Sequence, residues 1–305
     1  MGMQTKPVNR IPQIVLKVIL WVLVAVYTFM LPNAIIVYRA LVTDFGKVAA
    51  GEVPLIVVVI VGIAYAAAIL FSHRSWKNLF FLVPCGVIAF AIMKLVDNPN
   101  KHIHIPEYVL MAWLLYAVLS KDHTGKGLLI LIFVYGSMLG VVDELEQGIN
   151  PARFYGLSDM MVNSASVLIG VFTIMGLKKI IATDWAWTRR LKEFKALAGF
   201  GLLGLTGVAL MCAYLFKVQA AGHFWGIYPV WLWTWNILYL IMAPAMIPFY
   251  REALRKYHQN TGDKKDPVLP PELVTARLWI VPLLVILFYM QVLLLYVSIS
   301  GVKFN

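Results

Sequence analysis

Polar and ionisable side chains gather in three short stretches of an otherwise apolar chain. In each stretch three of them recur at the spacing of one helical face: His104, Glu107 and Tyr108, then Asp143, Glu144 and Gln147, and then Asp159, Asn163 and Ser166. A histidine beside carboxylates can exchange protons near neutral pH, so this combination of residue types indicates acid–base chemistry.

The same residues suggest roles in a reaction on a phosphorylated substrate. We expect His104 and Glu144 to transfer protons, while Asp143 orients His104 or acts as a second carboxylate. Arg153 offers a planar fork that suits a phosphate group. The remaining polar residues would bind substrate together with Arg153: Asp159, Asn163, Gln147, Lys101, Glu107 and Tyr108. Such a set suits a phosphorylated lipid headgroup.

Metal ligation is a second chemistry that these residue types permit. Nitrogen and oxygen ligands are available, but no HExxH or equivalent spacing occurs, and His102 and His104 are two residues apart and do not share a helical face. We therefore assign no metal ligand from the sequence and leave the cofactor unknown. If an ion binds, the form that fits best is a divalent ion between carboxylates and a phosphate.

Simpler interpretations exist for each residue alone. His104 and Glu107 can satisfy each other at a helix start, and Asn163 and Ser166 can hydrogen-bond between helices. Gly170 would then be a position of close helix packing. By the same reasoning Glu146 faces solvent, and His102 faces either water or the pocket. These interpretations explain poorly why the polar residues converge.

The composition places these residues in a membrane protein. The chain has 305 residues, 61% of them hydrophobic and only 13% charged, with a mean hydropathy of +0.79, against about 45–50% apolar and 25% charged residues in soluble domains. Runs of spanning length occur at 13–32, 53–71, 79–96, 106–120, 127–142, 158–177, 197–216, 225–249 and 278–299. These runs predict an all-α, polytopic helical bundle of about nine transmembrane helices.

The chain has a net charge of +11, which in a soluble protein could indicate nucleic-acid binding. The distribution of its basic residues instead indicates an orientation in the membrane and argues against a nucleic-acid partner. With the N-terminus in the cytoplasm, 19 of the 26 Lys and Arg residues fall on the cytoplasmic side and seven on the other. The prediction is a multi-pass protein of the cell membrane with a non-cytoplasmic C-terminus. All three polar stretches then open toward the outer leaflet.

Several segments outside the polar stretches carry their own predictions. Residues 184–195 fit either an amphipathic helix at the inner interface or a plain connector, and 251–272 fit an exposed loop. The glycines within 199–207 indicate intramembrane packing rather than a phosphate cradle. Four tryptophans could either anchor the chain at the interface or dock a membrane protein partner on the C-terminal spans: Trp225, Trp231, Trp233 and Trp235.

The polar stretches resemble the motifs of the VanZ-like family. Residues 100–108 read Asn-Lys-His-Ile-His-Ile-Pro-Glu-Tyr, which is similar to the family's Asp-Lys-x-x-His-Phe-x-x-Tyr. Residues 135–147 contain Tyr-Gly and then Asp-Glu-Leu-Glu-Gln, which is similar to its Tyr-Gly followed by Asp-Glu-x-x-Gln. Pro-Ala-Arg at 151–153 and Asp-Met-Met-Val-Asn at 159–163 resemble its Pro-Gly-Arg and Asp-x-x-x-Asn. The resemblance covers approximately residues 77–178, and Asn100, Ala152, Gly156 and Ser166 depart from the family pattern.

The resemblance implies a four-helix core named for an association with teicoplanin resistance and similar to proposed lipid-headgroup-processing enzymes. It divides the chain into a two-span segment at 1–75, a VanZ-like core at 76–180, and an interfacial helix with three spans at 181–305. We expect an enzyme that cleaves or exchanges a headgroup of a phospholipid or a polyprenyl-phosphate-linked glycan at the outer leaflet. The alternatives are a transporter or flippase of an amphipathic envelope lipid or drug, and a non-catalytic accessory subunit.

Overall fold

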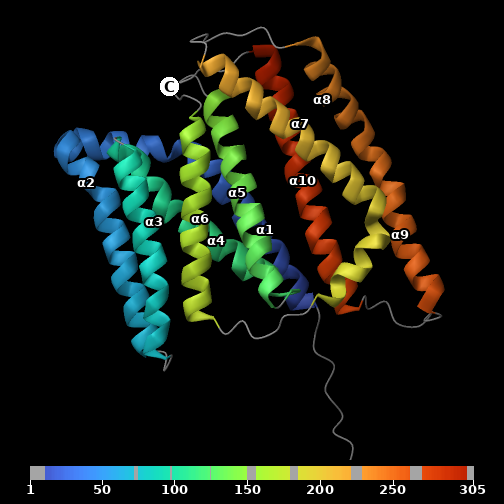
Figure 1. Ribbon diagram of the computed structural model, residues 1–305, viewed down its shortest axis with the longest axis horizontal. Coiled ribbons are helices and arrows are strands. Elements are labelled where there is room, and N and C mark those ends of the chain that lie inside the picture. Colours follow the sequence, from blue (N-terminus) through green and yellow to red (C-terminus); the bar gives the residue numbers. More distant parts are fainter. Residues whose placement is uncertain are drawn as a thin grey trace, which may run out of the picture.

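The computed structural model describes residues 11–71, 75–96, 98–123, 125–149, 156–178, 185–220, 229–261 and 270–300. Over these residues the chain is all-α, as predicted (Figure 1). The long helices are α1 (Ile11–Met30), α2 (Ala34–Phe71), α3 (Leu82–Leu95), α4 (His104–Leu119), α5 (Lys126–Ile149), α6 (Leu157–Leu177), α7 (Lys195–Ala220), α8 (Val230–Met242), α9 (Met246–Thr261) and α10 (Pro271–Ser300). Short 3-10 helices join them: η1 (Leu31–Asn33), η2 (Trp76–Phe81), η3 (Pro99–Ile103), η4 (Ala186–Phe194) and η5 (Ala243–Ala245).

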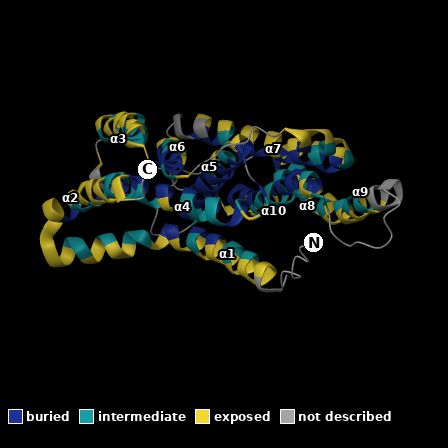
Figure 2. Ribbon diagram, turned by 90° about the horizontal axis from the view of Figure 1, so that it is seen from below, coloured by how far each residue is buried: buried dark blue, intermediate teal, exposed yellow. Residues whose placement is uncertain are grey.

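Eight helical segments of the described chain are long and apolar enough to cross a membrane. The first, Gln13–Phe71, contains two of the nine predicted spans, so the exact count of crossings stays a prediction. Large apolar side chains lie exposed along the outer helices, for example Val18 on α1, Ile63 on α2 and Phe90 on α3. Figure 2 shows these helices mostly exposed around a buried centre. This distribution suits a bundle whose outer surface contacts lipid.

Helix α2 changes direction sharply at Gly46. This residue has φ +83° and ψ 160°, a backbone conformation that is essentially restricted to glycine. Residues 34–45, which we call the α2 arm, run across one end of the bundle, and the rest of α2 then descends beside α3 (Figure 1). The sequence predicted a connection between two spans here, and the structure shows helix instead.

Helices α4, α5 and α6 form the centre of the N-terminal half. A Cβ placed on Gly170 of α6 would lie 2.5 Å from Cβ of Ala112 on α4, so these helices meet at the closest approach that their backbones allow. Gly140 of α5 meets Asn163 of α6 in the same way, at 2.9 Å from Cβ to Cβ. Close packing fixes the ends of the three helices relative to one another. The end where α4 begins, α5 ends and α6 begins is called the site end below.

The C-terminal helices pack against this core through α10 and α5. Gly204 and Gly207 on α7 give room to the side chains of Tyr239, Trp235 and Gln291, so the glycines of 199–207 that have close neighbours do serve packing between helices. Such small-residue contacts are typical of membrane bundles, where close van der Waals approach drives helix association.

Two segments are defined further by the structure. Within 184–195, where the sequence left open an interfacial helix or a plain connector, residues 186–194 form the 3-10 helix η4, and its Trp187 and Phe194 are buried against α9 and α10. Trp187 stacks on Trp279 with ring centroids 4.7 Å apart. The predicted loop at 251–272 is wrong for its first part, because α9 continues to Thr261. An ion pair between Glu252 and Arg255, 2.7 Å apart at i,i+3, supports this helix.

Candidate functional site

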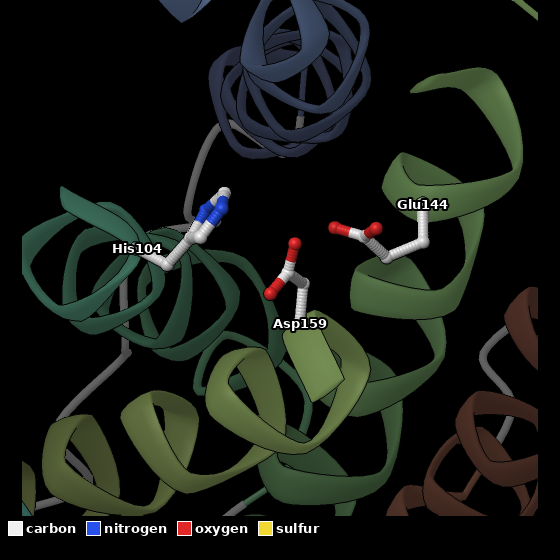
Figure 3. A group of neighbouring side chains, drawn as sticks. All are labelled: His104, Glu144 and Asp159. Atoms are coloured by element: carbon white, nitrogen blue, oxygen red, sulfur yellow. The ribbon is translucent and has the colours of Figure 1, made fainter. Parts of the chain in front are cut away.

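Three buried side chains from three helices converge at the site end. His104 is the first residue of α4, Glu144 lies in the last turns of α5, and Asp159 lies in the first turn of α6. Their exposed fractions are 7%, 0% and 6%. One nitrogen or oxygen atom of each residue lies within 4.8 Å of the corresponding atoms of the other two. Figure 3 shows the three side chains pointing toward one another, and we call them the triad.

Glu107 holds the histidine of the triad. Its Oε2 atom lies 3.0 Å from Nδ1 of His104, one turn earlier on α4. The pairing expected as a simple interpretation therefore occurs, and Glu107 rather than Asp143 orients the ring. Because Nδ1 is occupied, Nε2 is the ring nitrogen left for the rest of the triad.

Gly156 bonds one carboxylate of the triad through its backbone and lies against the other. Its N–H donates to Oε2 of Glu144 at 3.1 Å, while Gln147 donates to Oε1 at 3.2 Å. A Cβ on Gly156 would lie 2.4 Å from Oδ2 of Asp159. Only a glycine therefore lets the start of α6 bond Glu144 and leave Asp159 in place.

Lys101 balances part of the negative charge at the triad. Its ammonium lies 2.8 Å from Oδ1 of Asp159, and it donates to the hydroxyl of Ser158 at 3.5 Å. The Ser158 hydroxyl in turn donates to Oδ1 of Asp159 at 3.2 Å. Asp159 is thus fixed from the η3 side and from its own helix.

Further buried polar groups lie beside the triad: Asp143 precedes Glu144 on α5, and Tyr108 and Asn163 lie one helical turn beyond His104 and Asp159. The hydroxyl of Tyr108 donates to Oδ2 of Asp143 at 2.9 Å, and Nδ2 of Asn163 donates to the carbonyl of Gly140 at 3.3 Å. Asp143 and Asn163 are fully buried. The Oδ1 atoms of both residues have no hydrogen-bond partner among the described residues. Buried acceptors of this kind are costly unless a bound molecule or ion satisfies them.

A cavity of about 410 Å³ opens beside the triad. The polar side chains at its wall come from η3 and helices α4, α5 and α6: Lys101, His104, Glu107, Gln147 and Asp159. The apolar side chains come from η1 and both sides of the Gly46 bend in α2: Leu31, Ile35, Leu41, Ala50, Val53 and Pro54. The cavity therefore has one polar and one apolar side.

Tyr38 and Arg39 of the α2 arm also line the cavity, and the sequence analysis did not assign them to the site. Arg39 lies between two apolar runs together with Lys47, and a basic residue in such a place is a signal of interest in a membrane protein. The signal could not be used without knowing that the arm folds back across the site end.

The structure places the remaining predicted residues as follows. His102 lies outside the triad, because its Nε2 is 3.0 Å from the carbonyl of Val96. Glu146 accepts a hydrogen bond of 2.5 Å from Tyr289 on α10, so it joins two helices rather than facing solvent. The hydroxyl of Ser166 donates to its own helix, to the carbonyl of Val162 at 2.7 Å. Arg153 falls outside the described residues.

The chemistry open to this arrangement is proton transfer or ion binding at a buried acidic site beside an amphipathic cavity. Comparisons with known proteins add no family to this description: no protein-family model, no curated protein and no solved structure matches the chain.

Proposed function

We propose that the protein is a membrane-embedded enzyme that cleaves or exchanges the headgroup of a phospholipid or polyprenyl-phosphate-linked glycan. The observation that carries this proposal is the two-sided cavity. One side holds His104 and Asp159, and the other, formed by η1 and α2, is mainly apolar but carries Tyr38 and Arg39. A ligand that fits both sides has a polar head and a hydrocarbon tail.

The polar side supplies the groups that the reaction requires. The triad activates the attacking hydroxyl group, which belongs to water in cleavage and to an acceptor headgroup in exchange. That oxygen forms a new bond to phosphorus while the bond to the original headgroup breaks, and the departing oxygen takes up a proton. Lys101 and Arg39 line the same cavity and offer positive charge to the phosphate oxygens.

Burial is a second reason to favour chemistry over simple helix packing. Carboxylates with no exposed surface are expensive in a membrane protein and mark functional sites. Asp143 and Glu144 both have 0% exposure and sit on consecutive positions of α5. The resemblance of this segment to VanZ-like motifs points in the same direction and belongs to the same proposal, as does the placement of the site at the outer leaflet.

The test is a comparison of membrane lipids and lipid-linked precursors by mass spectrometry. Cells would express the wild type, Glu144→Gln, His104→Ala or the control Glu272→Gln at matched membrane levels. Glu272 lies at the start of α10, at the opposite end of the bundle from the triad. We expect a headgroup product with the wild type and the control, and its loss with the two triad variants.

Two results would contradict the proposal. Equal product from Glu144→Gln and wild type would remove the triad from the reaction. A lipid that changes leaflet without any change in mass would indicate transport instead, and a flipping assay in vesicles with the same variants would detect it.

A further inference from the structure

We infer that the triad is a binding site for a divalent first-row cation, of the Mn²⁺ or Zn²⁺ type. One imidazole nitrogen and two carboxylate oxygens form a ligand set that suits such ions. The inference concerns the same site as the proposed function and gives it an inorganic cofactor. With the ion bound, His104 and Glu144 are ligands, and proton transfer passes to an ion-bound water.

The geometry of the triad fits three ligands on one ion. Ligand atoms around such an ion lie about 2.1 Å from it and therefore about 3 to 4 Å from one another. The three side chains already bring an atom each to within 4.8 Å of the others. Rotation of the Glu144 and Asp159 carboxyl groups about their terminal torsions would close the difference. Three protein ligands leave a position open for water or a phosphate oxygen, as in catalytic sites.

The partners around the triad are those of a metal site. A ligating histidine commonly gives its second ring nitrogen to a carboxylate, which fixes the ring and its tautomer. Glu107 does this for His104, with 3.0 Å between Oε2 and Nδ1. The ligating carboxylates are also held by hydrogen bonds. Gly156 holds Glu144, and Lys101 and Ser158 hold Asp159.

The charge of the region is the independent observation that calls for a cation. Four carboxyl groups lie in and around the triad, on Glu107, Asp143, Glu144 and Asp159. Among the described residues, the ion pairs that reach them come from Lys101 and, when protonated, His104. Buried carboxylates that lack counter-charges are strongly destabilising, and a bound divalent ion supplies two positive charges.

Asp143 adds a directional argument. It is fully buried and next to Glu144, and it interacts electrostatically with His104 of the triad. Its Oδ1 has no hydrogen-bond partner among the described residues, while Tyr108 holds Oδ2. A carboxylate oxygen without a partner, on the residue next to Glu144 of the triad, is suited to accept a hydrogen bond from an ion-bound water.

The first test is Mn²⁺ binding to the purified full-length chain in lipid nanodiscs. Binding is measured as the loss of the free-ion signal in electron paramagnetic resonance. We expect one saturable site in the wild type that Zn²⁺ displaces. Glu144→Gln and Asp159→Asn should abolish the site, and Glu107→Gln should weaken it by about 10- to 100-fold. Glu272→Gln is the matched control and should bind like the wild type.

The second test reads the ligand directly and does not depend on stable carboxylate variants. Pulsed measurements on bound Mn²⁺ detect coupling to an imidazole nitrogen, which we expect in the wild type and not in His104→Gln. The absence of saturable binding of both Mn²⁺ and Zn²⁺, or binding without nitrogen coupling, would overturn the inference. Mn²⁺ binding that survives both Glu144→Gln and Asp159→Asn would also overturn it.

The outcomes separate the ion site from the proposed function. Ion binding without any lipid product leaves the site standing and removes the proposed reaction. A lipid product that persists after chelation, in a chain that binds neither ion, leaves the reaction standing and removes the site.

Discussion

Two sets of buried polar residues occur in this molecule, and they differ in whether their side chains can carry charge. The first is the ionisable set at the site end of α4, α5 and α6. The second is a neutral set between α7, α8 and α10, where Asn236 is 1% exposed and Gln291 is fully buried. Nε2 of Gln291 on α10 donates to the carbonyl of Gly204 on α7 at 3.1 Å, so the bond joins the two helices. The amide atoms of Asn236 have no partner among the described residues.

The difference teaches how to separate packing from function inside a membrane. Neutral amides can join helices at low cost, since an unsatisfied amide is far cheaper to bury than an unpaired charge. The site end instead buries carboxylates and a histidine beside a cavity of about 410 Å³. Polar character alone does not distinguish the two sets; only the first combines ionisable groups with a cavity, and the proposed function rests on that combination.

The largest expected effect is that of Glu144→Gln. The variant keeps the size of the side chain and removes its charge, so formation of the lipid product should fall by about 100-fold or more. Thermal stability in detergent should stay the same or rise, because a buried charge is removed. The equivalent change in the neutral set, Gln291→Leu, should leave product formation unchanged. If Glu144→Gln instead lowered thermal stability but kept wild-type activity per folded molecule, Glu144 would serve packing rather than chemistry, and the comparison would be reversed.

The close approach of α4 and α6 predicts the next effect. Gly170→Ala places a methyl group 2.5 Å from Cβ of Ala112, which should destabilise the protein by about 1–3 kcal/mol. Gly86→Ala on α3 is the control, because its Cβ meets no atom within 4 Å. Thermal unfolding in detergent measures both. Equal midpoints for the two variants would show that the helices do not meet at Gly170.

A smaller effect is expected at Gly156, whose N–H donates to Glu144 and whose Cα lies against Asp159. Gly156→Ala should displace the Asp159 carboxylate and lower product formation by about tenfold without unfolding the chain. Gly199→Ala on α7, where the added Cβ has no neighbour within 4 Å, serves as the matched control. Lipid analysis at equal expression separates them. Full activity of Gly156→Ala would mean that Asp159 can move without consequence.

The smallest effect belongs to the neutral set. Asn236→Leu removes an amide without partners and keeps the branched shape of the side chain at a somewhat larger volume, so stability should change by less than about 1 kcal/mol and activity should not change. The thermal midpoint and the lipid profile are the two readouts. A loss of several kcal/mol would show that Asn236 satisfies a partner, and the neutral set would then be more than helix packing.

Much of the site end follows from helical periodicity. His104, Glu144 and Asp159 stand on faces whose other members are also polar, at helix ends that the predicted topology puts on one side of the membrane. That information predicts a shared polar pocket provided that the three helices pack together, and the structure brings the three side chains together. Gly170 was similarly identified as a position of close packing, because small residues mark contacts between membrane helices.

Other parts could not be predicted, for identifiable reasons. Arg39 enters the cavity only because α2 bends at Gly46, and a single glycine does not reveal the direction of a bend. Gly156 was noted in the sequence only as a departure from the family pattern, whereas in the structure its backbone N–H donates to Glu144. The bond between Glu146 and Tyr289 joins residues 143 positions apart and has no local signal.

The bend at Gly46 has a consequence for how a substrate arrives. The α2 arm lies across the site end, and the apolar wall of the cavity continues on both sides of the bend (Figure 1). A lipid would then enter sideways from the leaflet rather than by diffusion through water. The reaction rate should follow the mole fraction of substrate in the bilayer, and dilution with inert lipid should slow it even when the bulk concentration is constant.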